Sequence, residues 1–225
     1  MNSRKLVGLF FKTLFLGAFV SLVASFFVNA HIYSENLQPF DAVGLIGLFL
    51  WYTVYGMLYS IVSQAGFFAY LFIHRFGLGL FRNFWPTVQI GLIAFVIFDL
   101  IYFPYKATQG EVALYWWILM SFSLLGVGII VATIKAKQTH PRAFVPALFL
   151  MVVMTAIEWV PGLQTEGTDY ATLMIFTLVA CNAYQLLVLH KLSGSKAREE
   201  LNNSKQKHHH PKKKGNKKRK RPKKA

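Results

Sequence analysis

The chain has 225 residues, and 55% of them are hydrophobic, a fraction above that of most soluble proteins. Its formal net charge is +15, but residues 191–225 carry +13 of this charge, so the rest of the chain is nearly neutral. The uneven charge argues against a nucleic-acid-binding body, and a single cysteine, Cys181, excludes an internal disulfide. The composition predicts an integral membrane protein with a basic tail.

Apolar runs with few charges locate the membrane spans, because about twenty helical residues cross a hydrocarbon core about 30 Å thick. Six runs follow one another at 14–30, 42–73, 85–105, 112–134, 143–159 and 171–189. The second run is too short for two spans, and we favour one tilted helix over a helix broken near Gly56 or Gly66. The expected fold class is all-α: a polytopic bundle of six transmembrane helices in residues 1–190.

The charges between these runs predict the orientation, because loops rich in Lys and Arg stay in the cytoplasm. If the N-terminus is inside, 23 of the 24 Lys and Arg residues fall on the cytoplasmic side and only Lys106 falls outside. An odd number of spans would break this alternation. We therefore expect a multi-pass cell-membrane protein with both termini inside.

Two carboxylates lie within the predicted spans. Asp99 is about seven residues from the outer boundary at Lys106, and Glu158 is near the end of its span, beside Trp159 and Pro161. A carboxylate inside a membrane is costly and is a candidate functional group. The alternative is a structural acid that hydrogen-bonds a neighbouring helix or reaches water. Both residues are kept as candidates.

Small and polar residues recur every four positions on two predicted helices: Gly17, Ser21 and Ser25 on the first, and Gly56, Ser60 and Gln64 on the second. The first stripe favours close internal packing of helices over a dimer interface, and the second favours hydrogen bonds between helices over a substrate site. Asn182 and Gln185 lie at a similar depth on the last helix. We expect Gln64 to form an interhelical hydrogen bond with Asn182 or Gln185.

The sequence contains no catalytic motif. Neither the HExxH pattern nor the GxSxG pattern occurs, and the predicted loops are too short for a catalytic domain. Three consecutive histidines at 208–210 lack further ligands for a specific metal site. We expect no enzymatic activity, no metal and no cofactor.

The segment 191–225 is predicted to be a disordered cytoplasmic tail, because it has too few apolar residues to form a core. Its last part is dense in positive charge and is a candidate for binding anionic lipid: Lys212, Lys213, Lys214, Lys217, Lys218, Arg219, Lys220, Arg221, Lys223 and Lys224. Contact with RNA phosphates and a solvated tail that only reinforces the topology are the alternatives, and nucleic acid is not the favoured partner.

Three segments carry a family resemblance: SQAGFFAYLFIHRFGLG at 63–79, FWPTVQIGLIAFVIFDLIY at 84–102, and FDAVGLIGLFLW at 40–51. They resemble the KinB-signalling pathway activation protein family of endospore-forming bacteria. The resemblance is clearest over residues 1–105, and the long basic tail departs from it.

The resemblance implies a non-enzymatic regulatory protein of the bacterial cell membrane. Such a protein would promote the activation of a membrane sensor histidine kinase that feeds the sporulation phosphorelay. The alternative is a small membrane transporter or a substrate-binding uptake subunit. A transporter would need several polar groups converging near the midplane and often has repeated halves, and the sequence has no internal repeat.

Overall fold

The computed structural model describes residues 3–38, 40–107, 109, 113–163 and 168–208 of the chain. The described residues form helices and their connections, with no strand among them. The longer helices are α1 (Ser3–Val28), α3 (Ala42–Phe81), α4 (Trp85–Ala107), α5 (Leu114–Gln138) and α8 (Thr168–His208). Shorter elements are α2 (Ala30–Leu37), η1 (Arg82–Phe84), η2 (Pro141–Ala143), α6 (Phe144–Phe149), η3 (Leu150–Met154) and α7 (Thr155–Leu163).

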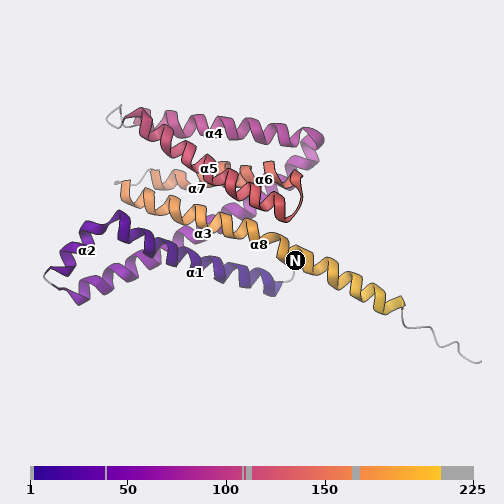
Figure 1. Cartoon of the computed structure of the whole chain (residues 1–225), viewed down its shortest axis with the longest axis horizontal. Helices are drawn as coiled ribbons and strands as arrows, with labels where there is room; N and C mark the ends of the chain where they lie inside the picture. The colour runs from indigo at the N-terminus through magenta and orange to yellow at the C-terminus, as the bar shows by residue number, and fades with distance from the viewer. Residues whose placement is uncertain (1–2, 39, 108, 110–112, 164–167, 209–225) are drawn as a thin grey trace, which may run out of the picture.

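The long helices lie roughly alongside one another, and the chain runs back and forth along the bundle (Figure 1). The N-terminus, the α3–α4 turn, the α5–α6 turn and the extension of α8 lie at one end, which is on the right in the figure. The helix α2 lies at the opposite end. The composite segment α6–η3–α7 runs through the interior, and η3 is fully buried.

Five stretches of the described chain are long and apolar enough to cross a membrane. One of them, Ala42–Lys106, has 65 residues and contains both α3 and α4. The helix α3 is unbroken over its 40 residues, as the length argument favoured. It begins where the Asp41 carboxylate accepts hydrogen bonds from the backbone N–H groups of Val43 and Gly44. It ends at Phe81, and the residue that follows, Arg82, has a positive φ.

The two small-residue stripes pack against each other. A Cβ added to Gly17 on α1 would lie 2.6 Å from the Ser60 Cβ and 2.7 Å from the Gly56 carbonyl oxygen on α3. A Cβ added to Gly56 would lie 2.6 Å from the Ser21 Cβ. The backbones of α1 and α3 thus approach more closely than larger residues allow, and the internal packing predicted for the stripe on α1 is confirmed.

The helix α8 differs in length from the expected span. The sequence predicts a tail without regular structure from residue 191, whereas α8 continues to His208. The candidate lipid-binding residues from Lys212 to Lys224 lie outside the described residues.

Candidate functional site

A buried polar network connects α3, α7 and α8 in the interior of the bundle. Its centre is Asn182 on α8, whose side chain is fully buried. The amide nitrogen of Asn182 donates to Thr155 Oγ1 at 2.9 Å and to Glu158 Oε2 at 2.7 Å. Its carbonyl oxygen accepts from Ser63 Oγ at 2.7 Å. One amide therefore links three segments that are far apart in the sequence.

Further bonds extend this network toward α1. Gln185 Nε2 donates to Ser63 Oγ at 2.8 Å, one turn along α8 from Asn182. Gln64 Nε2 donates to Ser60 Oγ at 3.2 Å within α3. Ser60 Oγ in turn donates to the Thr13 carbonyl oxygen of α1 at 2.8 Å. Hydrogen bonds of this kind hold helices together in lipid, where the hydrophobic effect contributes little.

The π-helical segment η3 precedes the two network residues of α7. Thr155 Oγ1 donates to the carbonyl oxygen of Leu150, five residues earlier, at 3.4 Å. Thr155 and Glu158 are three residues apart, so they share one face of α7 and both reach Asn182. Single π turns are frequent at functional sites, because they rotate the side chains that follow them.

The Glu158 side chain is 6% exposed, and only one of its two carboxyl oxygens has a hydrogen-bond partner among the described residues. Its Oε1 atom is buried and has no hydrogen-bond partner among the described residues. The carboxyl group lies against Gly66 of α3, where an added Cβ would collide with it. No Lys or Arg is among the residues that hydrogen-bond within the described network. The network thus contains one unused acceptor.

Asp99, the other candidate carboxylate, lies outside this network. It is half-buried on α4, and no described residue donates a hydrogen bond to it. Three exposed aromatic residues lie at same-face helical spacing from it, Phe95, Tyr102 and Phe103, and a fourth, Phe98, directly precedes it. The structure thus places Asp99 on an outward-facing stripe and Glu158 in the interior.

The predicted partners of Gln64 differ from the observed ones. Asn182 and Gln185 bond to Ser63, the neighbour of Gln64, and Gln64 bonds within its own helix. The polar stripe predicted the correct region of α3. Adjacent residues differ by about 100° around a helix, and α3 is rotated so that Ser63, and not Gln64, faces α8. Thr155 was also missed, although its position three residues before Glu158 was a usable signal.

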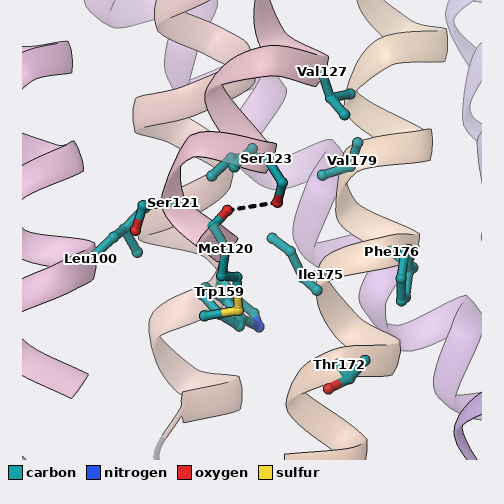
Figure 2. A pocket seen from close by; sticks show the side chains of 11 residues that line it. Leu100, Met120, Ser121, Ser123, Val127, Trp159, Thr172, Ile175, Phe176 and Val179 are labelled. Carbon is teal, nitrogen blue, oxygen red and sulfur yellow. Dashed lines mark hydrogen bonds between the residues drawn. The ribbon is translucent and has the colours of Figure 1, made fainter. Parts of the chain in front are cut away.

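A separate cavity of about 220 Å³ lies among α4, α5, α7 and α8. Figure 2 shows the lining side chains, with Trp159 below Met120 and with Ile175, Phe176 and Val179 along α8. Ser123 Oγ donates to the Met120 carbonyl oxygen at 2.7 Å. The neighbours of both candidate acids, Leu100 and Trp159, line the cavity, but Asp99 and Glu158 do not. Its lining provides no acid–base pair for catalysis.

The described residues contain no group of three or more His, Cys, Asp or Glu side chains that could hold a metal ion. The polar network is dominated by amides and hydroxyls that bond to one another. The fold and this site define a class: over the described residues, a helical protein whose long helices are apolar enough to span a membrane, with a buried polar network that ties helices together.

Comparison with known proteins identifies the particular family. The model of the family described as "KbaA: KinB-signalling pathway activation in sporulation" matches residues 17–192. A "KinB-signaling pathway activation protein" of Bacillus subtilis (strain 168) is 41% identical over 198 residues, which cover 86% of this chain and 99% of that protein. The chain belongs to this KinB-signalling pathway activation family, as the sequence resemblance predicted. No solved structure matches the chain.

Proposed function

We propose that the protein is a non-enzymatic regulator in the bacterial cell membrane that promotes activation of a membrane sensor histidine kinase during sporulation. Family membership carries this proposal, because the match spans residues 17–192 and the Bacillus subtilis relative is described as an activator of KinB signalling. The polar network supports a regulatory role over transport, since its donors and acceptors are mostly used within the bundle.

The proposed topology has six spans with both termini inside. It is supported by the course of the chain in Figure 1, where the N-terminus and the α5–α6 turn lie at one end and α2 lies at the other. Nearly all Lys and Arg residues of the described body belong to the first of these ends.

Cysteine labelling tests the topology in a Cys181→Ala background. A cysteine at Ser34 on α2 should react with a membrane-impermeant maleimide in intact cells. A cysteine at Thr139, after α5, should react only after the membrane is opened. Labelling of position 139 in intact cells would contradict the proposed orientation.

We assign the kinase contact to the α4 stripe that carries Asp99. A half-buried carboxylate among exposed aromatic side chains is costly next to lipid, unless a partner helix supplies a hydrogen-bond donor or a positive charge. Aromatic side chains provide large apolar contact area around such a polar anchor. The partner would be a transmembrane helix of the kinase with a donor or a basic residue at matching depth.

Replacing each carboxylate by its amide separates the two candidate acids. Asp99→Asn should preserve the abundance of the protein in the membrane but reduce co-purification of the sensor kinase and expression of a sporulation reporter. Glu158→Gln is the matched control, because its effect should follow protein stability. Normal kinase capture and normal reporter expression in Asp99→Asn would remove Asp99 from the contact.

A further inference from the structure

An open hollow of about 520 Å³ lies at the end of the bundle where α3, α5, α6 and α8 meet. This is also the end at which the α5–α6 turn lies in Figure 1. The hollow is separate from the polar network and from the cavity of Figure 2. Its polar lining comes from Tyr70, His74, Lys135, His140 and Arg142, and no Asp or Glu is among the lining residues that the structure describes. The hollow is therefore rich in hydrogen-bond donors and positive charge.

Lys135 is the central residue of this hollow. It is on the last turn of α5, and its side chain is only 6% exposed. Its ammonium group has three N–H donors, and one of them is used by the backbone carbonyl oxygen of Leu186 on α8. A buried ammonium that meets only a neutral acceptor is costly, because a charge removed from water needs a counter-charge. Within the described part of the chain, no carboxylate is among the residues that contact Lys135 in this hollow.

Both histidines of the hollow have one ring nitrogen already engaged as an acceptor. His74 Nδ1 accepts from Trp85 Nε1 at 3.0 Å, and His140 Nδ1 accepts from the backbone N–H of Arg142 at 3.1 Å. A neutral ring whose Nδ1 is an acceptor carries its proton on Nε2, which is then a donor. The histidines thus provide Nε2–H hydrogen-bond donors in addition to the donors of Lys135 and Arg142. The described lining contains no charged acceptor.

We propose that this hollow binds a phosphate group, carried by an anionic phospholipid or by a free phosphate compound, with Lys135 as its inner ligand and Arg142 as its outer ligand. Phosphate oxygens accept several hydrogen bonds at once, and Arg and Lys are the side chains that bind them best. Basic pockets between helices at the basic end of a membrane bundle suit the headgroups of anionic lipids. Apolar side chains of the lining, including Leu186 and Leu189, would adjoin the rest of a lipid.

Binding of phosphatidylglycerol to the purified full-length protein tests this proposal. The protein is delipidated in a neutral detergent, and native mass spectrometry measures the binding of phosphatidylglycerol and of a diacylglycerol with the same acyl chains. Wild type should retain phosphatidylglycerol and not diacylglycerol. Lys135→Gln and Arg142→Gln should each weaken the binding by roughly tenfold or more. Lys137→Gln is the matched control, because Lys137 is exposed on the same helix turn and does not line the hollow.

Titration with inorganic phosphate distinguishes the two possible carriers of the phosphate group, an anionic phospholipid and a free phosphate compound. Displacement of the lipid by millimolar phosphate, with the same dependence on Lys135 and Arg142, would indicate a free phosphate compound. Lipid binding that resists phosphate would indicate a headgroup site. The proposal fails if neither probe binds, if both lipids bind equally, or if Lys137→Gln weakens binding as much as Lys135→Gln. If Lys135→Gln does not fold, Arg142→Gln decides, and unchanged binding in that folded variant would overturn the proposal.

Discussion

The α1–α3–α8 side and the α4–α5 side of the bundle are held together differently. On the first side, glycines bring α1 and α3 into close contact and hydrogen bonds link α3 to α8. On the second side, the contacts are mainly apolar. Buried polar atoms of Gln89 on α4 and of Ser121 on α5 have no partner among the described residues, whereas on the first side this holds for the Ser21 hydroxyl of α1.

This difference has a physical consequence in lipid. Apolar side chains gain little by leaving lipid for another helix, so close backbone packing and interhelical hydrogen bonds carry more of the stability. We therefore expect the α1–α3–α8 side to be the rigid part of the bundle. The α4–α5 side should open at lower free energy, which agrees with the kinase contact that we propose for α4.

The glycine contact gives one of the two largest expected effects. Gly17→Ala should lower the free energy of unfolding by about 1–3 kcal/mol, because the new methyl group meets Ser60 and the Gly56 backbone and forces α1 away from α3. Unfolding of the purified protein in an SDS titration, followed by circular dichroism, measures the change. Gly8→Ala is the control on the same helix, since a Cβ at Gly8 meets nothing within 4 Å. Equal losses in both variants would contradict the tight α1–α3 contact.

Two fully buried amides provide the next comparison. Asn182→Leu should cost about 1–3 kcal/mol, because Ser63, Thr155 and Glu158 all lose a partner. Gln89→Leu should leave the stability unchanged or raise it by about 1 kcal/mol, because no hydrogen bond of Gln89 among the described residues is lost. The same SDS titration tests both variants. A loss in Gln89→Leu as large as that in Asn182→Leu would reveal a partner for Gln89 and remove the contrast between the two sides.

The smallest expected effect concerns two buried serines. Ser63→Ala removes the donor to Asn182 and the acceptor for Gln185, so we expect a loss of about 1 kcal/mol. Ser121→Ala removes a hydroxyl without a described partner and should change the stability by about zero. Thermal unfolding in detergent gives the difference between the two variants. The comparison fails if Ser121→Ala is the less stable of the two.

The family and the helical class were predictable from the sequence, and so was the internal packing of the small-residue stripe on α1. Gly17 and Gly56 stand out because their spacing places each with polar or small residues on one helix face. For the hydrogen bonds between α3 and α8, the sequence predicted the region of each helix but not the individual partner on α3. Gln64 and Ser63 are adjacent in the sequence, and only the rotation of α3 about its axis determines which of them meets α8.

Hydropathy and charge along the sequence predict an apolar, helical chain that is basic at one end, because each residue has its own preference for lipid or water. Which polar groups meet one another depends on the tertiary structure. Asn182 bonds to Glu158, which is 24 residues away in the sequence, and Lys135 bonds to the Leu186 backbone, which is 51 residues away. Asp99 lies outside the network. Such pairings depend on how the helices are rotated and stacked, which follows from the packing of all the helices at once and not from the pattern of any one of them.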